Sequence, residues 1–216
     1  MGFNLLARPY HLLEKAVFAN RLQHARCSHM QIFLEAKQIL LLGEGDGRFL
    51  EALLEEGCRA EIIYYDFSTE MRDVARKRVE GKGGNVRFHK GDIHQLSLPD
   101  NFRPDVVGAH FFLDCFREEE LVGIIRRIGA VIDLGGKMVV TDFQLPADSW
   151  IARLRGRLLI RLMLWFFQVF AGILARRLPD FYKLLTSQGW RCRKKALCSQ
   201  GLIGSWVMEI PPDKRS

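Results

Sequence analysis

Short apolar runs alternate with longer polar segments over much of this 216-residue chain. Five of the apolar runs have the length of strands: 39–43, 61–65, 85–89, 105–109 and 137–142. Three segments between them carry apolar residues at helical spacing: 47–57, 68–80 and 117–133. The repeat of strand and helix predicts a parallel sheet with helices on both faces. The continuous apolar character of the runs agrees, because such strands are buried on both sides.

The regions that flank this alternation complete a single-domain layout. Residues 190–198 and 203–210 are two strand-like runs joined by a four-residue connection, which predicts a terminal antiparallel hairpin. Residues 10–37 carry apolar positions at helical spacing and predict a cap over the sheet edge. The chain length fits one domain. The predicted organisation is a helical cap (1–37), a core (39–142), apolar helices (148–188) and the hairpin (190–210).

Composition and charge narrow the function classes. Apolar residues make up 48% and charged residues 26% of the chain, which is typical of a globular protein. The net charge of +7 fits either an anionic partner or simple solubility. The five cysteines include no C-x-x-C pair, which indicates reduced thiols in a cytoplasmic protein and predicts neither a metal site nor a disulfide framework.

A glycine-rich turn follows the first predicted strand and opens a helix. Its sequence, GEGDGR at 43–48, has the spacing G-x-G-x-G. A dinucleotide site would want a small residue at the position of Arg48, so this ligand class is disfavoured. Gly43, Gly45 and Gly47 allow close approach of a ligand to the backbone, and the N–H groups at the start of the helix can bind a carboxylate.

Acidic residues follow the next two predicted strands. Asp66, at the end of the second strand, is placed to accept hydrogen bonds from ribose hydroxyls. The alternative is that Asp66 caps the next helix, although Ser68 can do that itself. After the third strand, Asp92 can accept from an adenine amino group while Ile93 covers the ring. The alternative for Asp92 is an ordinary turn residue.

The glycine loop at 43–48, Asp66 after the second strand and Asp92 after the third occur in the same order as the cofactor-binding motifs of the class I S-adenosylmethionine-dependent methyltransferases, which this chain resembles. The resemblance implies a seven-stranded, mostly parallel Rossmann-like sheet, S-adenosylmethionine as cofactor and S-adenosylhomocysteine as product. It also implies that Phe67, Ser68 and Met71 surround the adenosine. One position departs from the family, because Leu41 stands where an acid is usual. We expect Glu44 to take over the contact to the cofactor's amino group; the alternative is a solvated loop carboxylate.

The segment after the fourth strand is where the acceptor would face the sulfonium. Its candidates for a general base are His110 and Asp114, and His110 is also expected to contact the cofactor. The alternatives are that His110 only hydrogen-bonds backbone and that Asp114 only caps a helix. Nearby aromatic residues would wall an apolar pocket or form part of the core: Phe111, Phe112 and Phe116.

An apolar run at 162–175 is flanked by six arginines. It is too short to predict a membrane span, and it is apolar on all sides. Three interpretations stay open: a buried lid helix, a hydrophobic substrate funnel, or peripheral membrane contact through 151–177. The link between positive charge and an apolar element favours a lipid-like substrate over a nucleic acid.

The N-terminal region is similar in layout to the cap of ubiquinone and menaquinone biosynthesis methyltransferases. This likeness implies that Tyr10 and Arg26 cover the cofactor, with Arg26 near its carboxylate; Tyr10 could equally be a core residue. We therefore expect a cytoplasmic methyltransferase that acts on a small hydrophobic or lipid-like acceptor, with membrane association through 151–177 left as an open interpretation. RNA or protein methylation and a non-catalytic S-adenosylmethionine-binding module are the alternatives, and the oligomeric state stays open.

Overall fold

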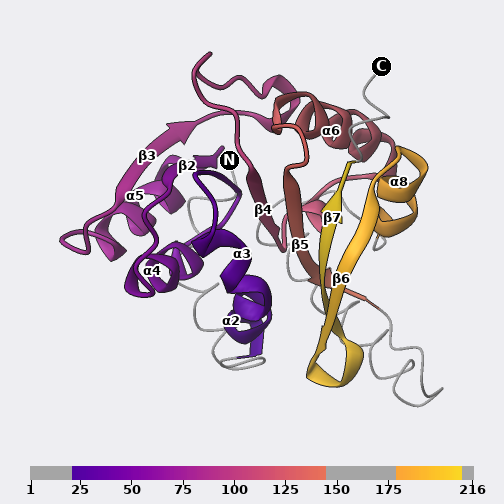
Figure 1. Cartoon of the computed structure of the whole chain (residues 1–216), viewed down its shortest axis with the longest axis horizontal. Coiled ribbons are helices and arrows are strands. Elements are labelled where there is room, and N and C mark those ends of the chain that lie inside the picture. Colours follow the sequence, from indigo (N-terminus) through magenta and orange to yellow (C-terminus); the bar gives the residue numbers. More distant parts are fainter. Residues whose placement is uncertain (1–20, 145–178, 211–216) are drawn as a thin grey trace.

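The computed structural model describes residues 21–144 and 179–210 (Figure 1). Its strands are β1 (Gln38–Leu42), β2 (Glu61–Asp66), β3 (Asn85–Lys90), β4 (Val106–His110), β5 (Lys137–Phe143), β6 (Arg191–Cys198) and β7 (Ile203–Glu209). Its α-helices are α2 (Arg21–Arg26), α3 (Met30–Leu34), α4 (Arg48–Glu55), α5 (Thr69–Arg78), α6 (Glu118–Val131) and α8 (Phe181–Ser187). Short 3-10 turns are η2 (Cys27–His29), η3 (Ile93–Gln95), η4 (Leu113–Cys115) and η5 (Ser199–Gly201).

The seven strands form one sheet in the order β3-β2-β1-β4-β5-β7-β6. The first five strands run parallel to one another, and β7 runs antiparallel to both β5 and β6. Each predicted strand is found within one residue of its expected bounds, and the terminal hairpin is present. The fold class predicted from the apolar pattern and the family resemblance is therefore confirmed.

Helices cover both faces of the sheet, as Figure 1 shows. On one face the core is built around α6 and α8, with Leu121, Ile125 and Leu185 among its buried residues. On the other face α3, α4 and α5 pack on the same strands, and Phe33 and Phe49 lie fully buried there. This three-layer arrangement explains why the central strands read as continuous apolar runs.

Exposure of the strands follows their place in the sheet. Strand β4 is buried at all five positions, and β1 is buried at four of five. Strands β3 and β6 form the two edges and are largely exposed. The strand order reverses between β1 and β4: the strands that follow β1 in sequence, β2 and β3, lie on one side of it, and β4 and β5 lie on the other. Sheets of this kind bind ligands in the crevice outside the carboxyl ends of the two strands at such a reversal.

Some predicted segments lie outside the described residues. Of the cap, residues 21–37 are described, and 21–34 form α2, η2 and α3, whereas Tyr10 is not described. The apolar run 162–175 is likewise outside them, and α8 belongs to the end of the predicted 148–188 segment. No helix within 21–144 or 179–210 combines the length and apolar character that crossing a membrane requires.

Candidate active site

The glycine loop between β1 and α4 has three residues in the left-handed region: Gly43, Gly45 and Gly47, with φ of 59°, 65° and 78°. Two of these positions have different surroundings. A Cβ added to Gly47 would lie 2.7 Å from the Cβ of Ala75 on α5, so this glycine permits close packing of helices. A Cβ added to Gly45 would meet nothing within 4 Å, so this glycine faces open space.

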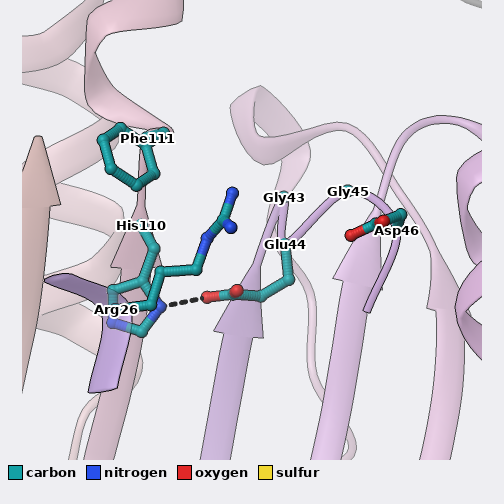
Figure 2. A pocket seen from close by; sticks show the side chains of 7 residues that line it. All are labelled: Arg26, Gly43, Glu44, Gly45, Asp46, His110 and Phe111. Carbon is teal, nitrogen blue, oxygen red and sulfur yellow. Dashed lines mark ion pairs between the residues drawn. The ribbon is translucent and has the colours of Figure 1, made fainter. Parts of the chain in front are cut away.

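A polar pocket lies under this loop at the ends of β1 and β4, and Figure 2 shows its lining. The Glu44 carboxylate points across the pocket toward the His110 ring, with Oε1 at 2.7 Å from Nδ1. Both side chains have 0% exposed surface. The contact is close, yet none of the four polar atoms of these two groups makes a well-formed hydrogen bond within the described part of the chain.

Arg26 at the end of α2 forms the roof of this pocket, and it is 4% exposed. Its guanidinium lies over the Phe111 ring, 5.1 Å from the centroid, and Figure 2 shows it above the level of the Glu44 carboxylate. Phe111 itself has a positive φ of 53°, which is strained for a bulky residue. Its ring also packs on Phe143 at the end of β5, with centroids 5.0 Å apart. A guanidinium held on an aromatic face suits binding of a carboxylate.

Asp46 lines the same pocket but has partners within the protein. Its carboxylate lies 3.1 Å from Arg48 Nε and 3.0 Å from Arg78 Nη2. The Arg78 Nε also donates to the Asp46 carbonyl at 2.8 Å, which ties the glycine loop to the end of α5. The tie to α5 could not be predicted from the sequence, because Arg78 lies 32 residues from Asp46 and no local pattern marks this pairing.

Asp66 ends β2 beside the glycine loop, as predicted. Its Oδ1 accepts a hydrogen bond from the Ser68 backbone N–H at 2.8 Å. Burial raises the pKa of Asp66 to about 6, against the opposing effect of the Ser68 and Gly45 backbone hydrogen bonds. Ser68 is the residue that caps α5, accepting from Met71 N–H at 3.2 Å, as expected. Asp66 is therefore not needed as the cap of this helix.

The residues expected around an adenosine lie at this same edge. Phe67 is 68% exposed, an unusual position for a phenylalanine, while Met71 is buried. Asp92 accepts from His94 N–H at 2.9 Å and so caps η3, which is the alternative weighed for it. Capping uses one carboxylate oxygen and leaves the other for a ligand. Ile93 is buried in the core next to Asp92.

The two candidate bases lie on opposite faces of the sheet. His110 is paired in register with Thr141, and its ring packs on Phe49. Asp114 follows β4 in η4, and its side chain hydrogen-bonds that of Asp142. Since Thr141 and Asp142 are consecutive in β5, they point to opposite faces. The structure therefore does not bring His110 and Asp114 together as one catalytic pair.

Asp142 is the residue that the sequence analysis missed. Its Oδ2 accepts from Asp114 N–H at 3.2 Å, and its Oδ1 accepts from Phe143 N–H at 2.9 Å. Burial, reinforced by the neighbouring Asp114 carboxyl, holds the pKa of Asp142 well above its usual range, and burial also raises the pKa of Asp114. Two hydrogen-bonded carboxyl groups share a proton in such a pair. The available signal was that strand five, like strand two, ends in an acid.

Taken together, the carboxyl edge of the sheet carries a row of acidic groups. Glu44 follows β1, Asp66 ends β2 and Asp92 follows β3. Arg26 adds one buried cation at the Glu44 end. The arrangement suits a nucleoside that carries both an anionic and a cationic group, since carboxylates accept hydrogen bonds from hydroxyl, amino and ammonium groups.

Comparisons with known proteins agree with this reading. Residues 39–136 match the family model described as a methyltransferase domain. The chain is 31% identical over 146 residues to the demethylmenaquinone methyltransferase of Thermus thermophilus. That alignment covers 67% of this chain and 65% of the relative, so the chain spans slightly less than two thirds of the relative's length.

Solved structures share the fold. An O-methyltransferase family protein from Burkholderia thailandensis superposes with a TM-score of 0.70 at 16% identity, over 95% of this chain and 59% of that one. The N-methyltransferase NodS from Bradyrhizobium japonicum, in complex with S-adenosyl-L-homocysteine, gives 0.65 at 16% identity over 91% of each chain. The sequence match, the sheet order and the glycine loop together support a class I, Rossmann-like S-adenosylmethionine-dependent methyltransferase.

Proposed function

We propose that this protein transfers a methyl group from S-adenosylmethionine to a small hydrophobic or lipid-like acceptor. The observation that carries the proposal is the row of carboxylates Glu44, Asp66 and Asp92 along one edge of the sheet. Their order matches the order of ammonium, ribose hydroxyls and adenine amino group along the cofactor. The cofactor supplies the methyl group on a positively charged sulfur, and the protein residues bind and orient it.

The adenosine half would be held at the ends of β2 and β3. Asp66 would accept from the ribose hydroxyls through the acceptor positions that its carboxylate keeps beside the backbone hydrogen bonds from Ser68 and Gly45. Asp92 would accept from the adenine amino group, with Ile93 beneath the ring. Phe67 is exposed where the adenosine would lie, and covering its ring would remove apolar surface from water.

The amino-acid half would occupy the pocket under the glycine loop. Arg26 would bind the carboxylate, and Glu44 would accept from the ammonium. Tyr10 would cover the cofactor from a segment outside the described residues. Both charges of the ligand would then meet an opposite charge that is already buried, which limits the cost of removing them from water.

The proposed acceptor is of the quinol class. The named activity of the Thermus thermophilus relative supports this class. Three phenylalanines after β4 also support an apolar acceptor: Phe111, Phe112 and Phe116. Phe112 and Phe116 pack on one another with ring centroids 5.0 Å apart. A membrane-facing role for 151–177 stays a prediction and is tested by flotation with liposomes of acidic and neutral lipid.

A general base at His110 or Asp114 stays a prediction. Methylation of a carbon or oxygen that carries hydrogen releases one proton, and a base is needed only in that case. The His110 side chain has no exposed surface, and Asp114 is 9% exposed. Of the two, Asp114 is the better candidate, because it keeps some exposed surface and burial raises the pKa of its carboxyl, which makes its carboxylate a stronger base.

The test is methyl transfer from methyl-labelled S-adenosylmethionine to reduced demethylmenaquinone, with total RNA and a protein extract as competing acceptors. Label in the extracted quinone, lost in an Asp66→Ala variant, is the expected result. Label in RNA or protein would replace the proposed acceptor class. Cofactor binding with no label in any fraction would instead support a binding module without turnover.

A further inference from the structure

We infer that His110 is a positioning residue: it holds the buried Glu44 carboxylate so that the site selects ligands ending in an α-amino acid group. The inference rests on the proposed cofactor site and goes beyond it, because it assigns His110 a task other than acid–base chemistry. It also predicts which adenosine compounds the site rejects.

The His110 ring is fixed by its place in the fold. It is the last residue of β4, and its side chain lies on the face covered by α3 and α4. Two aromatic rings pack edge-on against it, Phe49 with centroids 4.4 Å apart and Phe33 with centroids 5.8 Å apart. A ring held in this way can point Nδ1 toward the loop with little freedom to turn.

The Glu44 carboxylate depends on that nitrogen. His110 Nδ1 lies 2.7 Å from Oε1, within reach of the carboxylate as a donor in the tautomer that carries the hydrogen on Nδ1. In the described residues Oε2 makes no hydrogen bond, and Oε1 makes none of good geometry. A buried carboxylate with open acceptor positions is costly, and a ligand ammonium supplies both the charge and up to three N–H donors.

Glu44 lies in a loop, and its side chain therefore needs the contact with His110 to hold its orientation. Leu41 in β1 stands where the family usually has an acid, but it is fully buried among apolar residues and cannot contact a ligand. Glu44 instead lies between two glycines with positive φ, in a loop whose backbone leaves its side chain free to point elsewhere. Contact with His110 is what directs this carboxylate into the pocket.

Charge balance then sets the selectivity. A ligand with an α-ammonium and an α-carboxylate would place a cation beside Glu44 and an anion beside Arg26. An adenosine compound without this amino-acid end would leave Glu44 buried next to empty or water-filled space. S-Adenosylhomocysteine and 5′-methylthioadenosine differ by this end of the molecule, so they report on the pair directly.

The experiment is calorimetric titration of both ligands into the full chain and its variants. The wild type should bind S-adenosylhomocysteine at least about tenfold more tightly than 5′-methylthioadenosine, as expected for loss of a charge-assisted contact. His110→Phe keeps an aromatic ring between Phe33 and Phe49 but removes Nδ1. It should weaken S-adenosylhomocysteine about tenfold or more and change 5′-methylthioadenosine less than about twofold.

Two further variants separate positioning from a general structural role. His110→Asn places an amide N–H near the site of Nδ1 and should restore most of the preference for S-adenosylhomocysteine. Glu44→Gln keeps the side-chain volume and should lose the preference even with His110 present; it also keeps the test decisive if His110→Phe does not fold. In the double variant Glu44→Gln, His110→Phe, the loss should equal that of Glu44→Gln alone.

Other outcomes overturn the inference. Equal weakening of both ligands by His110→Phe would show a merely structural role. Equal wild-type affinity for the two ligands would also refute it while leaving the cofactor site in place. If the wild type bound neither ligand, the proposed function itself would be wrong.

Discussion

Two buried ionisable pairs lie at the carboxyl ends of neighbouring strands, and they differ in where their hydrogen bonds go. In the Asp114–Asp142 pair, backbone N–H groups and the partner carboxyl occupy the polar atoms. In the Glu44–His110 pair, the polar atoms face a pocket and lack well-formed hydrogen bonds within the described residues. The first pair completes itself inside the protein, whereas the second is completed by a ligand.

The same contrast holds for other residues of the site. Asp46 pairs with Arg48 and Arg78, whereas Asp66 accepts from the backbone N–H groups of Ser68 and Gly45 and keeps further acceptor positions for a ligand. Gly47 is packed against α5, whereas Gly45 faces open space. Buried polar groups are nearly always hydrogen-bonded in native proteins, so the atoms of Glu44 and His110 that lack a partner in the described residues and line the pocket are where we expect a ligand to bind.

The largest expected effect is on the free energy of unfolding, and it distinguishes Gly47 from Gly45. Gly47→Ala would combine a positive φ with a contact of 2.7 Å to Ala75, and should lower the free energy of unfolding by about 2–4 kcal/mol. Gly45→Ala should cost only about 1 kcal/mol, because its methyl group meets open space, while weakening cofactor binding. Urea unfolding and calorimetry measure the two effects. Equal loss of stability in both variants would contradict the assignment.

Asp66→Ala tests the ribose contact. Removing a charge-assisted pair of hydrogen bonds should weaken S-adenosylhomocysteine by about 1.5–3 kcal/mol, as measured by calorimetry. Asp46→Ala is not a suitable control, because Asp46 ties the loop to α5. Asp73, an exposed residue on α5, is suitable, and Asp73→Ala should leave the affinity unchanged. Unchanged affinity in Asp66→Ala would rule out the ribose assignment.

Cofactor binding should also depend on pH through Asp66. Its pKa of about 6 in the free protein means that it gains a proton as pH falls through 6, and a protonated carboxyl is the poorer acceptor for ribose hydroxyls. Affinity should therefore be constant above about pH 7 and fall by up to about tenfold per pH unit below 6. Asp66→Asn should lack this component. Parallel pH profiles for the two proteins would show that Asp66 does not titrate on binding.

The smallest expected effect is on the pH dependence of stability, and it concerns the Asp114–Asp142 pair. A raised folded-state pKa means that the stability from protonated Asp142 is present at low pH and is lost as pH rises through that pKa. Asp142→Asn cannot lose a proton and so gives a pH-independent reference, although its amide replaces one of the two oxygens that accept backbone N–H groups. Its Tm relative to wild type should rise as pH increases above the ordinary carboxyl range, by roughly 2–4 °C for each kcal/mol. A constant difference as pH rises would refute a shared proton.

Much of the fold could be predicted from the sequence because its signals are local. Apolar runs marked the strands, Ser68 marked the start of α5, and Arg48 distinguished the loop from a dinucleotide site. The family and the fold are both confirmed. These features depend on residues within a few positions of each other, where periodicity and capping rules apply.

The pairings within the site could not be predicted, because they join distant residues. Glu44 meets His110 only once β1 and β4 lie side by side, and Asp114 meets Asp142 only across β4 and β5. The face to which His110 points depends on strand register, which the sequence alone left open. Expectations for Tyr10 and 151–177 stay predictions, since these residues lie outside the described part of the chain.

The most direct test compares the two pairs in one experiment: S-adenosylhomocysteine titrated into wild type, Glu44→Gln and Asp142→Asn under identical conditions. The account predicts that Glu44→Gln binds at least about tenfold more weakly, while Asp142→Asn binds as wild type does. Loss of binding in Asp142→Asn with full binding in Glu44→Gln would contradict it, because the ligand would then depend on the pair that the protein completes by itself.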